Sequence, residues 1–258
     1  MKSLRFAAAV GLGFGLALGV VPAIATFAAT DPPAATPAVE PQALQALRRM
    51  SAYLNTLTRF EVTTQTSLDL VTAKGQKLQI NGGARYKVRR PDGFVIDLVS
   101  DVKNRRYIYD GKQFTVFAPA LGYYATAPAP ATIRQTLEDI YDKYGIRLPL
   151  EDLFRWSDPN SSRSEELESG FVVGPSTIDG AAVDHYAFRE HGLDWEIWIQ
   201  KGDQPLPRKL VIVDPTDPAY PAYNAVLTWN VSPTIANGDF AFDPPKDAKS
   251  IRLTAANP

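Results

Sequence analysis

Arg90 occupies the position in this sequence that is most informative about chemistry. It continues the apolar half of an alternating segment, which comprises Leu78, Ile80, Gly82, Ala84, Tyr86 and Val88. Side chains of a strand alternate between its two faces, so the Arg90 guanidinium is predicted to point inward. A charge among apolar neighbours is unfavourable unless it is paired, hydrated or bound to a ligand. The alternative is that Arg90, which precedes Pro91, ends the strand with its head group in water.

The two histidines are the next candidates for chemistry. His185 and His191 are close in sequence to Asp194, and two histidines with one carboxylate can bind a metal ion. However, His185 falls on an expected strand and His191 in a turn, so their side chains need not converge. The alternative is one hydrogen-bonded structural histidine and one solvated histidine. We therefore expect no metal site and no cofactor.

The sequence offers little support for catalysis. It has no Gly-x-Ser-x-Gly motif, and the serines at 161, 162 and 164 lie in a polar stretch. Acidic pairs such as Glu165 and Glu166 are adjacent, and adjacent residues do not face each other on a helix. We expect no catalytic residue and a protein that is not an enzyme.

The amino-terminal segment predicts export. Residues 1–25 carry Lys2 and Arg5, then an apolar run, then Ala23-Ile24-Ala25, the small-x-small form that signal peptidase accepts. A retained membrane anchor is the alternative, although glycines and a proline interrupt the run. Residues 26–41 are rich in proline and alanine and are expected to form a disordered leader. We expect a soluble, exported, periplasmic protein.

Composition excludes several functions. The formal net charge of −1 gives no basic face for nucleic acid, so we expect no nucleic-acid partner. The chain has no cysteine, and therefore no disulfide, no thiolate metal site and no acceptor for a lipid anchor.

Hydrophobic periodicity defines the folded part, which we expect to be a single domain over residues 42–258. A helical stripe that includes Leu44, Leu47 and Leu54 begins it, and strands joined by tight turns follow as far as residue 124. After a proline-rich break at 127–130, a helix is expected from Ile133 to its stop at Gly145. A short helix is expected from Pro149, and a polar surface loop at 157–169.

Alternating strands then return over 182–188, 193–200, 208–213 and 223–231. The fold class is therefore α+β, with a large curved antiparallel sheet of about ten strands. This sheet would form an unclosed half-barrel, and helices would cover its concave side.

Three motifs carry a family resemblance. They are YKVRRPDGF at 86–94, the turn YDGK at 109–112 before an apolar strand, and FAFDPP at 240–245. In this order they resemble the LolA/LolB-like periplasmic carriers of outer-membrane lipoproteins, and most closely an uncharacterised branch of predicted periplasmic proteins with that fold. The resemblance covers roughly residues 42–252.

The resemblance implies a half-barrel that holds acyl chains under a helical lid. It implies that Arg90 is a buried arginine that helps to hold the lid and is coupled to loading of the client. The expected ligand-binding residues are those on apolar strand positions, namely Phe60, Tyr86, Val88, Arg90, Phe94, Trp195, Tyr223 and Trp229. The expected lid residues are Ile133, Leu137 and Tyr141.

The function expected from these residues is that of a non-enzymatic carrier or sensor for a lipid or an acylated protein, with transient contacts to inner- or outer-membrane proteins. A tyrosine-rich lid and an aromatic second half differ from the carriers and leave the cargo open. The alternative is a structural or interaction module of the cell envelope with a filled core.

Overall fold

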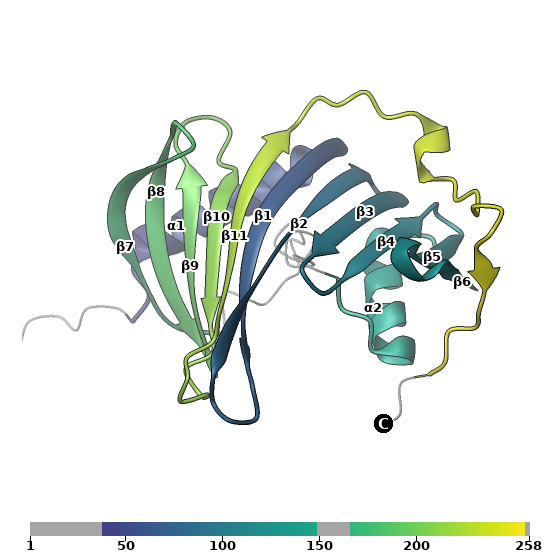
Figure 1. The fold of residues 1–258 in the computed structure, drawn as a ribbon. Helices are drawn as coiled ribbons and strands as arrows, with labels where there is room; N and C mark the ends of the chain where they lie inside the picture. Colours follow the sequence, from purple (N-terminus) through teal and green to yellow (C-terminus); the bar gives the residue numbers. More distant parts are fainter. Residues whose placement is uncertain (1–37, 149–165, 256–258) are drawn as a thin grey trace, which may run out of the picture. The chain divides into compact units, whose positions relative to one another are not determined.

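In the part of the chain that the structure describes, one large curved sheet carries two helices on its concave side (Figure 1). The computed structural model describes residues 38–148 and 166–255. The predicted signal peptide, most of the predicted leader and the short helix expected at Pro149 lie outside the described residues.

Twelve strands make up the sheet, and they are ordered β12-β6-β5-β4-β3-β2-β1-β11-β10-β9-β8-β7. Their bounds are β1 (Arg59–Val71), β2 (Lys77–Arg89), β3 (Gly93–Ser100), β4 (Asn104–Tyr109), β5 (Gln113–Ala118), β6 (Tyr123–Pro128), β7 (Leu167–Ile178), β8 (Ala181–Glu190), β9 (Leu193–Gln200), β10 (Pro207–Val213), β11 (Ala222–Asn230) and β12 (Lys249–Ser250). All neighbouring pairs are antiparallel except β12 with β6.

The predicted fold class is confirmed, but the expected number of strands was too small. Strand β7 was not predicted, and its first residues lie in the stretch expected to be a surface loop. Strand β12 has only two residues, too few for a recognisable alternation. The sheet is open, because β7 and β12 stand at its two edges in the described part of the chain.

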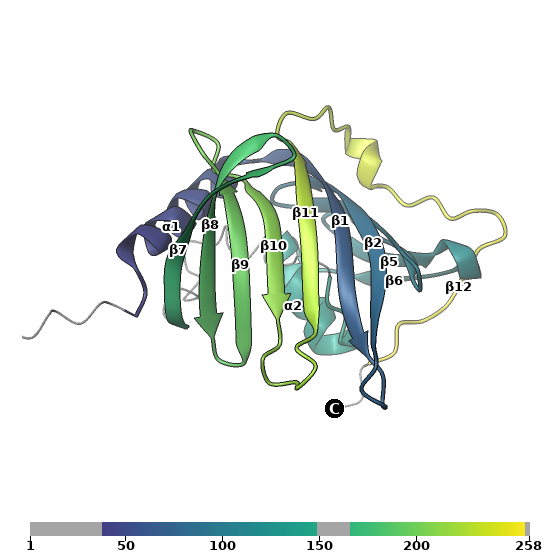
Figure 2. The ribbon, with the colours of Figure 1, turned by 60° about the vertical axis from the view of Figure 1, so that its left-hand side comes forward.

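Helix α1 (Pro41–Thr56) covers the side of the sheet that holds β7 to β10 (Figures 1 and 2). Its most buried residues include Ala43 and Ala46, whereas Leu44 and Leu47 of the predicted stripe are only half-buried. In the first half of the helix the buried face is therefore rotated by one residue from the prediction, whereas Leu54 is buried as predicted. The small alanine side chains permit close approach between the helix and the sheet.

Helix α2 (Ile133–Tyr144) lies under the other side of the sheet, near β3 to β5 (Figure 1). The Thr132 hydroxyl accepts a hydrogen bond from the backbone N–H of Gln135 at 3.3 Å, which caps the first turn. Gly145 ends the helix with a φ of 65°, a conformation that glycine adopts without strain. Both ends agree with the sequence.

The chain that follows β11 crosses the opposite, convex face of the sheet. Ile235 and Phe240 pack there against Val95 of β3 and Ile108 of β4. The 3-10 turn η3 (Asn237–Phe240) lies in this segment, which then continues to β12. We call residues 231–250 the carboxy-terminal strap.

Candidate functional site

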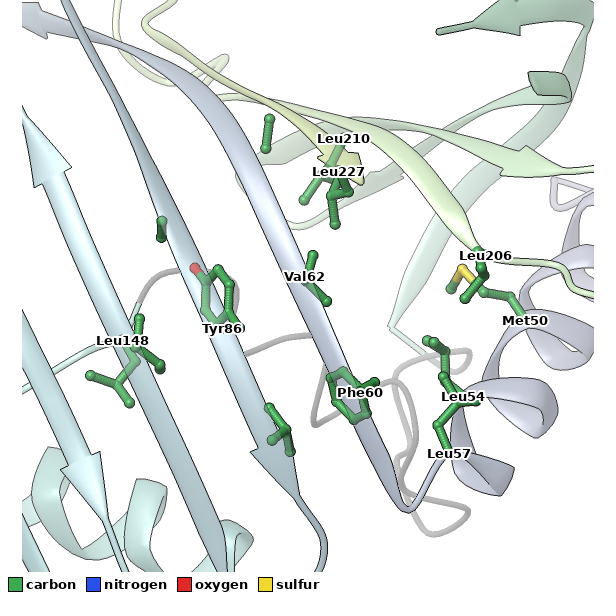
Figure 3. Packing of buried hydrophobic residues seen from close by; sticks show 14 of the residues in the cluster. Met50, Leu54, Leu57, Phe60, Val62, Tyr86, Leu148, Leu206, Leu210 and Leu227 are labelled. Atoms are coloured by element: carbon green, nitrogen blue, oxygen red, sulfur yellow. The ribbon is translucent and has the colours of Figure 1, made fainter. Parts of the chain in front are cut away.

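All eight predicted ligand-binding residues belong to the hydrophobic core on the concave side or to the end of a strand that borders it. The strand register places Val88 opposite both Phe60 and Phe94, and Tyr86 opposite Val62. Leu227 and Trp229 of β11 face the same side as Val62 of β1. Figure 3 shows Phe60, Val62, Tyr86 and Leu227 projecting from neighbouring strands toward this core.

Arg90 points inward, as its position in the alternation predicts, and binds a helix. Its Nη1 donates a hydrogen bond of 2.8 Å to the carbonyl oxygen of Leu54, in the last turn of α1. Its guanidinium lies 5.5 Å from the centre of the Phe60 ring. Burial lowers the pKa of Arg90, because desolvation disfavours the charged form. The carbonyl belongs to α1 and not to α2, the helix expected to be the lid.

A group of aromatic rings surrounds this end of the sheet. The Phe60 and Trp229 rings are 5.6 Å apart, and Trp229 Nε1 donates a hydrogen bond of 2.8 Å to the carbonyl of Pro207. The Phe94 ring lies 5.4 Å from that of Tyr109. The structure therefore brings Arg90, Phe60 and Trp229 together.

Trp195 and Tyr223 occupy other parts of the same face. Trp195 of β9 stacks on Phe188 of β8 with ring centres 4.4 Å apart. Burial raises the pKa of Tyr86 well above its usual value, and the nearby Tyr223 and Tyr107 raise it further. The phenols of Tyr86 and Tyr107, whose pKa values burial raises, therefore remain protonated at neutral pH.

The end of the concave face near α1 is tightly packed. Phe60, Tyr86, Val88 and Phe94 are each at most 2% exposed. A side chain that lines an open cavity remains accessible to water, so these residues belong to a filled core. A ligand would have to displace neighbouring side chains to reach them.

Two of the three predicted lid residues are buried, and the third is exposed. Ile133 and Leu137 are buried against the core, at 5% and 8% exposure. Tyr141 is 40% exposed, and the Arg147 guanidinium lies 4.0 Å from its ring centre. Helix α2 therefore packs through the face that carries Ile133, Leu137 and Ile140, while Tyr141 lies on its outer side.

Sequence reasoning missed a strip of exposed leucines at the other end of the concave face. Leu68, Leu70 and Leu78 are 46%, 49% and 41% exposed, although they share the strand parity of the buried Val62 and Tyr86. We call these three residues the leucine strip. It lies at the hairpin end of β1 and β2, which extends away from the rest of the sheet (Figure 1). The alternation in the sequence identified this face but not how far the helices cover it.

The residues considered for a metal site have other partners. His185 stacks on Trp198 with ring centres 3.8 Å apart, and its Nε2 lies 2.7 Å from a carboxylate oxygen of Glu196. Both Asp194 oxygens accept hydrogen bonds of 2.6 Å from Arg189, and His191 is fully exposed. Within residues 38–148 and 166–255, no three histidine or acidic side chains are arranged to hold a metal ion.

Comparison with other proteins decides the family of this chain. The sequence family described as predicted periplasmic protein (DUF2092) matches residues 43–254. The chain belongs to this family. Its membership confirms the branch expected from the sequence motifs and the predicted periplasmic location. Cleavage of the signal peptide stays a prediction. No curated protein matches the chain in sequence.

Solved structures with a similar fold include an uncharacterised conserved protein from Thermus thermophilus. It has 13% identity and a TM-score of 0.49, with 82% of this chain and 99% of that chain covered. The lipoprotein LppX of Mycobacterium tuberculosis has 13% identity and a TM-score of 0.48, over 76% of this chain and 99% of its own. A LolA superfamily protein from Nitrosomonas europaea has 7% identity and a TM-score of 0.36, over 78% and 97%.

Among the described residues, no helix has both the length and the apolar character needed to cross a bilayer.

Proposed function

We propose that the protein is a non-enzymatic periplasmic carrier or sensor that binds an acyl chain on the concave face of its sheet. The acyl chain would belong to a lipid or to a lipid-modified protein. The observation that carries this proposal is the leucine strip, an apolar surface that continues the core beyond the area covered by the helices.

The energetics favour a ligand over water on this strip. Full burial of a leucine side chain is worth about 1.5–3 kcal/mol relative to exposure, so three half-exposed leucines leave several kcal/mol unrealised. Neighbouring Leu68 and Ile80 are cross-strand partners, as are Leu70 and Leu78, so the strip is continuous across β1 and β2. A flexible hydrocarbon chain fits a continuous, narrow apolar surface without a covalent step.

The delivery of such a cargo would require transient contact with proteins of the inner or outer membrane. Family membership supports the compartment, and the resemblance of the sequence motifs to lipoprotein carriers supports the class of cargo.

The packed core near α1 favours one alternative. If the aromatic residues around Phe60 and Phe94 have only a structural role, the protein is an interaction module of the envelope with no bound lipid. The two functions differ in whether an apolar molecule leaves with the protein when it is purified.

The experiment is native mass spectrometry of the protein exported with its own signal and purified gently from periplasm, before and after organic extraction. The carrier function predicts an additional mass that extraction removes. A protein that carries no such mass, and that also fails to bind an apolar fluorescent probe, would refute it in favour of the interaction module.

Matched variants connect the ligand to the leucine strip. Leu68→Gln combined with Leu70→Gln removes apolar surface from the strip. Val99→Gln removes exposed apolar surface from the convex side of β3. Loss of the additional mass or of the probe signal in the first variant but not in the second is expected. Equal retention in both would exclude the strip as the binding surface.

A further inference from the structure

Arg105 is a second arginine on the concave face of the sheet. It lies on β4 opposite Leu98 of β3, which packs against the core. Tyr107, two residues further on, is buried in the same core. The intervening residue, Arg106, faces the convex side and forms an ion pair with Asp97 at 3.4 Å. The two adjacent arginines therefore lie on opposite faces.

Arg105 differs in its partners from three arginines of the convex face. Arg89, Arg106 and Arg189 each pair with an aspartate. For Arg105 the structure shows only a hydrogen bond of 2.7 Å from Nη1 to the neighbouring backbone carbonyl of Asn104. No carboxylate within residues 38–148 and 166–255 lies at ion-pair distance from it. A half-buried guanidinium beside apolar side chains therefore has most of its five donors available.

A phenol group adds a further donor beside this charge. Burial raises the pKa of Tyr107, and the positive charge of Arg105 opposes part of that rise. Arg105 thus adjoins the protonated Tyr107 hydroxyl of the same strand, and such a hydroxyl can donate a hydrogen bond to an anion.

The leucine strip lies within reach of Arg105. The register aligns Arg105 with Leu98, Ala84 and Thr64 across four strands. Leu68 follows Thr64 by four residues on β1. With about 3.3 Å per residue along a strand and about 4.8 Å between strands, the separation is roughly 20 Å. That distance suits an extended long acyl chain with its head group at Arg105.

We propose that Arg105 binds the anionic head group, a carboxylate or a phosphate, of an acyl amphiphile whose chain covers the leucine strip. This inference rests on the proposed carrier function and names the class of ligand. Arg105 determines specificity for charge, while the strip supplies affinity for the chain. The arrangement separates the two contributions, because charge recognition and hydrocarbon burial occur on different strands.

The test compares three ligands of equal chain length on the mature protein, namely octadecanoate, octadecyl phosphate and octadecanol, by competition with an apolar fluorescent probe. A charge-assisted hydrogen bond is worth about 1.5–3 kcal/mol, so at least one anion is expected to bind about 10-fold to 100-fold more tightly than the alcohol. The anion that shows the larger preference identifies the head group as carboxylate or phosphate.

Three variants test whether Arg105 causes the tighter binding of the anion relative to the alcohol. Arg105→Gln should reduce the ratio of anion affinity to alcohol affinity to about 1-fold, and Arg105→Lys should retain part of the preference. Arg106→Gln should leave the ratio unchanged, because Arg106 faces the convex side. Added salt should weaken binding of the anion and not that of the alcohol in the wild type, which tests the charge without any substitution.

Equal affinity for anion and alcohol in the wild type would overturn the inference and leave the carrier function in place. A preference that survives in Arg105→Gln would also overturn it. Failure of all three ligands to bind would refute the carrier function itself, and the inference with it.

Discussion

Substitution of Arg90 tests how the first helix is fixed to the sheet. Arg90→Met keeps the apolar stem of the side chain and removes the guanidinium that donates to the Leu54 carbonyl at 2.8 Å. A hydrogen bond to a charged group contributes about 1.5–3 kcal/mol, and a cation near a helix carboxyl end adds about 0.3–1 kcal/mol. Part of this is offset, because the substitution also relieves the desolvation that lowers the pKa of Arg90.

We expect a net loss of about 2 kcal/mol in the free energy of unfolding. With a urea dependence of about 2 kcal/mol per molar, the midpoint should fall by roughly 1 M. Hydrogen exchange should also become faster in the last turn of α1, since that is where the bond is lost.

The matched control is Arg85→Met on the same strand. Arg85 is exposed on the convex face and should change the midpoint very little. Equal midpoints for the two variants would show that the bond to Leu54 contributes no net stability, and the inward orientation of Arg90 would need another explanation.

Two further predictions concern the strap and the central strands. The Lys87 ammonium lies 2.9 Å from Asp239 and lowers the pKa of that carboxyl. The stabilisation from this ion pair is therefore present above about pH 4, the usual pKa of an aspartate. It is lost as the pH falls through the lowered pKa that Asp239 has in the folded state. Asp239→Asn should accelerate proteolysis of the strap at neutral pH, and a difference that persists at pH 2 would contradict this. Gly83→Ala would place a Cβ atom 2.5 Å from the Thr64 carbonyl, so thermal unfolding should begin roughly 6 °C lower, from a loss of about 2 kcal/mol. Gly238→Ala meets no atom within 4 Å and is the control, and equal melting temperatures would refute the clash.

Strand alternation predicted the faces of the central strands, because one face of each is buried and its side chains have a strict period of two. Strand β7 escaped prediction for a physical reason. Gly170, Gly174 and Pro175 interrupt its apolar pattern, and its register against β8 shifts twice. Bulges of this kind change which residues share a face, so periodicity fails where they occur.

The site was less predictable than the fold. The partner of Arg90 is a backbone carbonyl, and carbonyls carry no residue type that a sequence could display. Arg105 was missed because the polar run at 103–106 shows no apolar alternation, whereas β4 already begins at Asn104. The exposure of the leucine strip depends on which part of the concave face helices α1 and α2 cover. That coverage is set by tertiary packing and not by the local sequence pattern.

The two inward-facing arginines indicate which end of the concave face is available for function. Arg90 lies where the strands meet α1, its guanidinium is bonded to a carbonyl, and the aromatic rings around it are buried. Arg105 lies farther from α1, on the same face as the exposed leucines and roughly 20 Å from Leu68, and has no carboxylate partner in the described part of the chain. A fold that needed only stability would gain from an aspartate near Arg105, as it has near Arg106. An unpaired charge on the same face as an uncovered apolar strip is instead the arrangement expected of a site for an amphiphile. We therefore place recognition between Arg105 and the hairpin end of β1 and β2, and assign Arg90 to the structure.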